Sequence, residues 1–360
     1  MPEGPEVRRH ADAIGRILVG EPLRRVEART KAARAWLDTH GAALVGRRVT
    51  AVTSHGKHLV GTLEAMPAGG DAPMPDVSPS DPDRSPSDPD RSPSDRSPSD
   101  PFGGQAPYFH SHLMMWGRWH VFDAAAGEVA PGPDRRDRAR LVTDRGTALL
   151  RSAPVFTLGL GDPYASEPLL ATLGPDALPV EGPAAFDAAE VRRRMAAQAD
   201  REVGAVLLDQ QAVAGLGNYL RAEVLFLCRL SPFRRVASLD EAEWTCLLAA
   251  IPEVTARAYR TGGVTLSPGD AARIASDAAL VYTPGAAWQH RHYVFRRTNL
   301  PCLACGTPVR QARQVTREAI AVAGDVEAAA AAPEAARTER IVYFCPACQG
   351  VDVPPPRPRR

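Results

Sequence analysis

Hydrophobic positions change their period along the chain, and the changes divide it into regions. Val7, Ala11, Ile14 and Leu18 repeat at helical spacing, which predicts an amphipathic helix over residues 4–19. Short runs rich in β-branched and aromatic residues follow, and they predict strands at 26–28, 48–53, 58–63, 108–121 and 140–151. Many short strands within about 150 residues indicate a β-sandwich or barrel.

From about residue 165 the pattern becomes helical. Helices are predicted at 187–198, 201–213, 218–228, 239–249 and 251–261. A β-rich region with paired cysteines follows at about 285–350. We therefore expect an α+β multidomain chain, made of a β-sandwich with an N-terminal helix at 1–160, a helical domain with a linker at 161–284, a cysteine-bearing β domain at 285–350 and a disordered tail at 351–360.

Two compositionally biased segments interrupt this plan. Residues from about 66 to 107 contain imperfect copies of Ser-Pro-Ser-Asp-Pro-Asp-Arg, which has almost nothing to bury, so this insert is expected to be disordered. The flanking strands should pair as a hairpin, because a longer loop costs little. A second insert, at about 315–337, is rich in Ala and Glu and is expected to be a short helix or disordered.

Composition excludes some classes of protein. The chain is 44% hydrophobic and 24% charged, as is ordinary for a soluble protein, and no apolar stretch approaches the ~20 residues of a membrane span. Without a secretion-signal pattern, a cytoplasmic location is expected. Eight Asp and three Arg in residues 71–101 contribute −5 to the net charge of +1, so the rest of the chain carries +6. That mildly basic remainder permits DNA binding.

The N-terminus carries a candidate nucleophile. If Met1 is removed, Pro2 presents a secondary amine, and an α-amino group with a pKa near ~8 is partly unprotonated at neutral pH. Attack on an aldehyde-level carbon gives a cationic iminium, which draws electrons and promotes elimination at the neighbouring carbon. Glu3 could shuttle the protons. The alternative is that Pro2 is only a stiff start to the chain.

Two glycine-containing motifs are candidate phosphate sites. Lys57 follows a glycine turn and opens an apolar strand, so its ammonium can hold a phosphate; the alternative is a solvated surface lysine. Further along, Gly215 and Gly217 are expected to end one helix, and Asn218 to cap the next. Amides at that helix start can hold a phosphate, and the alternative is an ordinary helix–helix corner.

The cysteines fall into two groups. Cys302, Cys305, Cys345 and Cys348 form two Cys-x-x-Cys pairs, whose four thiolates suit one tetrahedral structural zinc. The 39-residue gap between the pairs exceeds the usual ~15–20, which indicates an insert. A redox role is the alternative for the pairs. The remaining two, Cys228 and Cys246, stand in apolar surroundings and are expected to be core residues.

These motifs occur together and in a fixed order. Pro-Glu-Gly-Pro-Glu at residues 2–6, Gly-Lys at 56–57, Ala-Gly-Leu-Gly-Asn-Tyr-Leu at 214–220 and the cysteine pairs resemble the formamidopyrimidine-DNA glycosylase/endonuclease VIII family, and are closer to the endonuclease VIII branch. The resemblance implies a β-sandwich, a helix–two-turn–helix domain and a zinc-finger β-hairpin. It also implies a monomeric bifunctional DNA glycosylase/AP lyase of base excision repair, acting on double-stranded DNA with oxidised bases or abasic sites in the bacterial nucleoid.

The resemblance further implies roles for single residues. Pro2 would attack C1′ of the damaged nucleotide, with Glu3 as acid/base and Glu6 in support. Phosphate contacts would come from Lys57, His112, Asn218 and Arg340, the last of which stands five residues before Cys345. Met115, flanked by Met114 and Trp116, would fill the space that a flipped base leaves. Plain core packing is the alternative for these three apolar side chains.

The substrate is the most open inference. The endonuclease VIII branch prefers oxidised pyrimidines, and the sister branch prefers oxidised purines, including 8-oxoguanine. The start and corner motifs favour pyrimidines, whereas residues 262–266 and the stretch to Tyr293 resemble the purine branch. We expect an enzyme for oxidised pyrimidines that cuts by β,δ-elimination. The alternatives are an oxidised-purine glycosylase and a non-catalytic damage-binding zinc protein.

Overall fold

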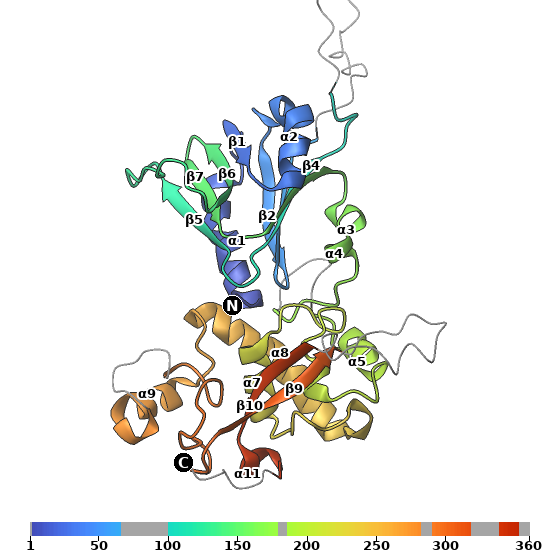
Figure 1. Cartoon of the computed structure of the whole chain (residues 1–360), viewed down its shortest axis with the longest axis vertical. Coiled ribbons are helices and arrows are strands. Elements are labelled where there is room, and N and C mark those ends of the chain that lie inside the picture. Colours follow the sequence, from blue (N-terminus) through green and yellow to red (C-terminus); the bar gives the residue numbers. More distant parts are fainter. Residues whose placement is uncertain (1, 66–99, 179–185, 282–289, 318–337, 353–360) are drawn as a thin grey trace, which may run out of the picture.

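The computed structural model describes residues 2–65, 100–178, 186–281, 290–317 and 338–352 (Figure 1). The N-terminal region holds two four-stranded antiparallel sheets, as a β-sandwich requires. One sheet has the order β1 (Arg25–Ala28), β6 (Asp137–Thr143), β7 (Gly146–Arg151), β5 (Arg118–Asp123). The other has the order β2 (Val49–His55), β3 (His58–Leu63), β4 (Pro107–His112), β8 (Val155–Leu160).

Helix α1 (Gly4–Leu18) runs from the junction of the two halves of the molecule into this sandwich (Figure 1). Its predicted stripe is confirmed, because Val7, Ala11, Ile14 and Leu18 are all buried in the core shared with the sheets. Burying an aliphatic side chain of this kind stabilises the fold by roughly 1.5–3 kcal/mol. Helix α2 (Lys31–Leu44) was not predicted, since it fully buries only Ala33 and Leu44 and so has no clear apolar stripe.

Two strand predictions need correction. The run 108–121 breaks into β4 and β5 at the turn 113–117, and the run 140–151 is the β6–β7 hairpin. Strand β8 was missed. The first insert, predicted at about 66–107, was given too late an end. Residues 100–106 are part of the described structure, and Asp100 forms a buried ion pair with Arg47. The remaining residues of that insert, 66–99, lie outside the described residues.

Arg47 holds both ends of the connection between β3 and β4. Its Nη1 donates to the backbone oxygen of Glu64 at 3.2 Å, and its Nη2 donates to the Asp100 carboxylate. The guanidinium lies 4.4 Å from the ring centre of Phe102. The two strands pair antiparallel from His58–His112 to Thr62–Tyr108, so the expected hairpin is confirmed.

The second half of the molecule is helical, and most of its predicted helices are present. Its elements are α3 (Pro163–Ser166), α4 (Pro168–Ala171), α5 (Ala188–Ala196), α6 (Val203–Val206), α7 (Asn218–Leu227), η2 (Val236–Ser238), α8 (Glu241–Thr261), α9 (Pro268–Ser276) and η3 (Ala278–Leu280). The predictions at 187–198 and 218–228 are confirmed as α5 and α7. Among the described residues, no helix is both long and apolar enough to cross a membrane.

Three helix predictions need correction in their extent. The helix expected at 201–213 is an α-helix only from Val203 to Val206, and the chain beyond it continues in tight turns, in which Asp209 donates to the backbone oxygen of Val206. The helices expected at 239–249 and 251–261 are one helix, α8, which continues through Pro252. Buried Leu247, Ile251 and Val254 carry one apolar face across that proline.

The two isolated cysteines are a further correction. Cys228 ends α7 and Cys246 lies in α8, and the two form a disulfide rather than separate thiols in the core. The C-terminal region is a hairpin of β9 (Arg310–Arg317) and β10 (Thr338–Phe344), followed by α11 (Pro346–Gln349). Because β9 reaches Arg317, the second insert begins later than predicted; residues 318–337 and the predicted tail from 353 lie outside the described residues.

Candidate active site and nucleic-acid interface

The N-terminus of the chain is fixed to the start of α7. The Glu3 carboxylate accepts backbone hydrogen bonds from Gly217 at 2.7 Å, Tyr219 at 2.9 Å and Leu220 at 3.2 Å. Amides at a helix start lack partners within the helix and favour a negative charge. Asn218 is therefore not the cap that the sequence predicted: Gly217 occupies the cap position, and Glu3 supplies the acceptor.

Glu3 is suited to proton transfer at neutral pH. It is 2% exposed, and burial raises its pKa to about 7, opposed by the charge of Lys57 and helped by that of Glu6. The amide donors of α7 also oppose the rise. A carboxyl with such a pKa can both give and take a proton near pH 7. Pro2, the residue before it, is partly exposed.

Glu6 orients this segment. Its Oε2 accepts from the backbone N–H of Glu3 at 2.9 Å, and its Oε1 accepts from the hydroxyl of Tyr219 at 3.0 Å. Burial raises the pKa of Glu6, and these two donors oppose the rise. Tyr219 thus connects α7 to α1 by its backbone and by its side chain. It lies inside the motif 214–220, although the sequence analysis gave it no role.

Lys57 lies on the turn between β2 and β3, which presses against the corner before α7. Gly56 has φ +54°, and a Cβ there would lie 2.8 Å from the Cβ of Ala214 and from the backbone nitrogen of Gly215. Asp176 accepts from the backbone N–H of Gly56 at 2.7 Å. Only glycine fits this turn, which accounts for the Gly-Lys pair.

Charges from two distant parts of the chain act on Lys57. Burial lowers the pKa of Lys57, the Glu3 carboxylate opposes this, and the Arg340 charge lowers the pKa further. The pKa of buried Asp176 is raised to about 7 by its removal from water. Asp176 was missed, since one aspartate in a connecting segment gives no sequence signal.

The turn between β4 and β5 presents three large apolar side chains to solvent. Met114, Met115 and Trp116 are 50%, 52% and 78% exposed. Core packing, the alternative considered for them, is therefore wrong. Adjacent apolar side chains in water are costly, and such groups mark contact surfaces.

His112 lies at the base of this turn. Its Nδ1 accepts from the backbone N–H of Met114 at 3.1 Å, so Nε2 carries the proton in the neutral ring. Burial, followed by the charge of Lys57, lowers the pKa of His112 to about 4. His112 is therefore a neutral hydrogen-bond donor at pH 7.

Two further predicted phosphate ligands meet near the same corner. Asn218 is partly exposed in the first turn of α7, and Arg340 is exposed on β10. Arg221 connects Asn218 to the strand that carries Arg340. Its Nη2 donates to Asn218 Oδ1 at 3.2 Å and to the backbone oxygen of Ile341, the neighbour of Arg340, at 2.8 Å. The structure thus brings Lys57, Asn218 and Arg340 to the junction where Pro2 lies.

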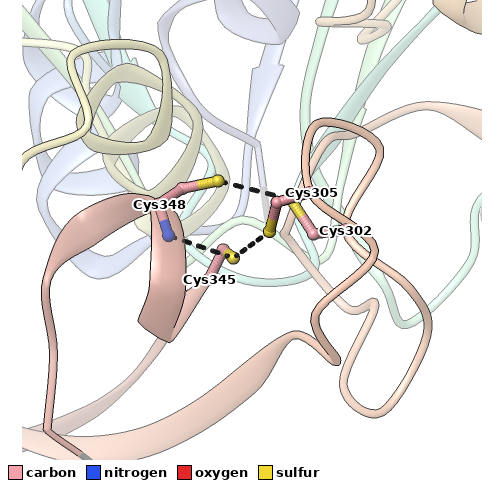
Figure 2. A group of neighbouring side chains, drawn as sticks. All are labelled: Cys302, Cys305, Cys345 and Cys348. Atoms are coloured by element: carbon pink, nitrogen blue, oxygen red, sulfur yellow. Dashed lines mark hydrogen bonds between the residues drawn. The ribbon is translucent and has the colours of Figure 1, made fainter.

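The four predicted metal ligands form one cluster (Figure 2). The Sγ atoms of Cys302 and Cys348 are 3.8 Å apart, those of Cys305 and Cys345 are 3.5 Å apart, and all four Sγ atoms lie within 4.8 Å of one another. A tetrahedron with metal–sulfur bonds of ~2.3 Å has sulfur–sulfur edges of about 3.8 Å, so the cluster fits a metal ion. Gln349 braces it by accepting from the backbone N–H of Cys345 at 2.8 Å and donating to the backbone oxygen of Leu230 at 2.9 Å.

Comparison with known proteins identifies the class. Residues 1–153 match the formamidopyrimidine-DNA glycosylase N-terminal domain, and residues 173–269 match the formamidopyrimidine-DNA glycosylase H2TH domain. The chain belongs to the formamidopyrimidine-DNA glycosylase/endonuclease 8 family, whose members are DNA glycosylases with AP lyase activity. The resemblance seen in the sequence is therefore confirmed.

Named relatives come from both branches. Endonuclease 8 of Klebsiella pneumoniae is 31% identical over 73% of this chain and 82% of its own length. Formamidopyrimidine-DNA glycosylase of Thermus thermophilus is 32% identical over 97% of this chain and 99% of its own length. The crystal structure of the MutM (Fpg) protein from Thermus thermophilus has a TM-score of 0.60 at 30% identity, covering 98% of this chain and all of that one. A complex of Lactococcus lactis Fpg with abasic-site DNA shares the fold, with a TM-score of 0.61 at 20% identity, and covers 96% of this chain and 99% of that one.

Proposed function

We propose that this chain is a base excision repair enzyme that removes oxidised bases and cuts the DNA strand through Pro2. The observation that carries the proposal is the environment of the Glu3 carboxyl. It is buried next to Pro2 in the sequence, it accepts hydrogen bonds from the start of α7, and its pKa is raised to about 7. A nucleophile with an adjacent acid/base group in a buried site is the arrangement that covalent catalysis needs.

The proposed reaction begins after Met1 is removed. The Pro2 nitrogen bonds to C1′ of the damaged nucleotide, the bond from C1′ to the base breaks, and the base leaves with a proton. The nitrogen gives up its proton, O4′ takes one, and the C1′–O4′ bond breaks as the nitrogen lone pair forms the C=N bond of an iminium ion at C1′. That ion acidifies the hydrogen on C2′, so its removal expels the 3′ phosphate, and a second elimination expels the 5′ phosphate. Glu3 is the group placed to move these protons.

The same proposal assigns the DNA contacts. Lys57 and Arg340 supply cations for phosphate, while Asn218 and His112 supply neutral donors. The exposed Met114, Met115 and Trp116 would enter the base stack where the damaged nucleotide is extruded. These contacts should dominate the affinity, which should therefore fall with salt.

Cys302, Cys305, Cys345 and Cys348 would hold one zinc ion. The donor set and the sulfur spacing support this assignment. With all four ligand positions filled by thiolates, the ion would be structural. Its role would be to fix the hairpin that carries Arg340, with no part in the chemistry.

Oxidised pyrimidines are the proposed substrate class, on the strength of the motifs at 2–9 and 214–223. The relatives support both branches at similar identity, so an oxidised-purine glycosylase is the second candidate. Duplexes that contain thymine glycol, dihydrouracil or 8-oxoguanine test the choice in a nicking assay. Cutting of the 8-oxoguanine duplex alone would reverse it.

Borohydride trapping on an abasic-site duplex tests the catalytic proposal itself. The wild-type protein should form a covalent adduct with DNA, and protein that retains Met1 should not, because its Pro2 nitrogen is then an amide without a free lone pair. If mass spectrometry confirms that Met1 is absent and the wild type still forms no adduct, the chain is a damage-binding protein without this chemistry.

A further inference from the structure

Gln314 lies on β9 of the β9–β10 hairpin, here called the finger, and its side chain points into the helical domain. It stands directly opposite Arg340 in the β9–β10 ladder, yet it is buried. Its Nε2 donates to Glu202 Oε2 at 2.8 Å and to the backbone oxygen of Pro232 at 2.9 Å. Its Oε1 accepts from Arg221 Nη1 at 2.9 Å. Every polar atom of this amide is thus bonded to the helical domain.

Arg221, the partner of Gln314, is 0% exposed and joins three segments. Nη1 donates to Gln314 and to the backbone oxygen of Gly204 at 3.2 Å. Nη2 donates to Asn218 Oδ1 and to the backbone oxygen of Ile341. A guanidinium is a flat, rigid fork, so these acceptors are held at fixed relative positions.

This arrangement constrains both candidate phosphate ligands. With Oδ1 of Asn218 engaged by Arg221, the amide nitrogen of Asn218 is directed away from the guanidinium, which leaves its two N–H groups as donors for a ligand. Arg340 is held in two ways, through its chain neighbour Ile341 and through Gln314 across the ladder. Its own side chain remains exposed.

We propose that Gln314 and Arg221 are positioning residues that set Asn218 and Arg340 at one fixed spacing, so that the helical domain and the finger hold the DNA phosphates as a unit. This inference rests on the proposed function, because it takes both residues as DNA ligands. It adds a coupling between them, through buried side chains that never touch DNA. We call the bonded pair Gln314–Arg221 the bridge. Without it, Asn218 and Arg340 would each have to be ordered separately when DNA binds, and the lost conformational entropy would weaken the DNA affinity.

Gln314→Leu tests the bridge, and Gln311→Leu is the matched control. Gln311 lies on the same strand and is exposed. Binding of a duplex with a stable abasic-site analogue is measured by fluorescence anisotropy at several salt concentrations. We expect Gln314→Leu to bind about tenfold more weakly, with a salt slope shallower by up to about one unit, as for loss of one cationic phosphate contact. The control should match the wild type in both.

A double-mutant cycle separates positioning from a general structural role. If Gln314 acts through Arg340, then adding Gln314→Leu to Arg340→Ala should weaken binding by less than about twofold. A full tenfold loss in that background would overturn the inference. Arg221→Lys, which keeps the charge but loses the fork, should behave like Gln314→Leu. If Gln314→Leu unfolds, Gln314→Asn provides the same comparison, since it keeps the amide but withdraws it from Arg221.

The two proposals fail in different ways. Absence of a borohydride adduct in the wild type refutes the catalytic function. A wild type that traps DNA, together with bridge variants that bind like Gln311→Leu, refutes only the coupling.

Discussion

Gly217→Ala moves the Glu3 carboxyl without changing its chemistry. Gly217 has φ −133° and ψ −157°, an extended conformation that alanine adopts without strain. A Cβ at this position would lie 2.3 Å from Glu3 Cδ and 2.4 Å from its Oε1. Since carbon atoms pack at about 3.5–4.0 Å, the carboxyl must retreat by about 1 Å or more. That movement breaks its hydrogen bonds to the start of α7.

Two effects on activity should follow. General acid–base groups contribute about 10²–10⁴-fold to rate, so we expect strand cutting at saturating DNA to slow by about 10²-fold or more. The displaced carboxyl also regains water, so its pKa should fall from about 7 towards its ordinary value. The acid limb of the kcat/KM profile should therefore move to lower pH.

Single-turnover cutting of an abasic-site duplex between pH 5 and 9 measures both effects. Gly269→Ala is the matched control, because a Cβ at Gly269 meets no atom within 4 Å. The reasoning is refuted if Gly217→Ala cuts at the wild-type rate while Glu3→Gln is inactive. In that case the fixed position of the carboxyl on α7 would not matter for catalysis.

Four further outcomes are expected. Lys57→Gln removes a charge that opposes the effect of burial on Glu3, so the Glu3 pKa should rise above about 7 and the acid limb of kcat/KM should move to higher pH; an unmoved limb would contradict this. The folded-state pKa of Asp176, about 7, exceeds its unfolded value near ~3.9, so the wild type should lose up to about 4 kcal/mol as pH rises between these values. Asp176→Asn lacks that loss, and thermal unfolding should show its stability relative to the wild type rising from pH 5 to pH 8; a constant difference would oppose this. Reducing Cys228–Cys246, which are 18 residues apart, should cost about 3 kcal/mol and lower the Tm, whereas a Cys228→Ser/Cys246→Ser variant should not respond to reductant. Removing the metal with a chelator, or Cys345→Ser, should reduce DNA affinity at least as far as Arg340→Ala, measured by anisotropy; unchanged affinity would show that the cluster does not support the hairpin.

The sequence predicted correctly those elements that are determined by residues close together in the chain. The stripe from Val7 to Leu18 specifies α1 by its own spacing, and the two Cys-x-x-Cys pairs specify a cluster of four thiolates. Helix 201–213 was predicted from the same kind of pattern and stops at Val206, and within the predicted range the backbone oxygen of Gln210 accepts from Gly174, which lies outside the segment. Helical periodicity alone contains no information about those distant partners.

The candidate site was predictable by residue type but not by geometry. Pro2, Glu3, Lys57 and Asn218 were proposed from the sequence. The cap of α7 was assigned to Asn218, whereas Glu3 supplies it from 214 positions away. Arg221 and Gln314 were overlooked because a buried polar side chain and an exposed one look alike in sequence. Their importance depends on which segments fold against them.

Arg47 separates the sandwich from whatever chain joins β3 to β4. By binding Glu64 and Asp100 together, it closes the hairpin at its base and fixes the entry and exit points of the connection. These contacts lie in the described residues on either side of the connection, so we expect the base of the hairpin to keep its geometry when the length of the connection is changed. The connection between Glu64 and Asp100 is therefore a suitable insertion site. A reporter domain or affinity module placed in it should leave Pro2 and its surroundings undisturbed.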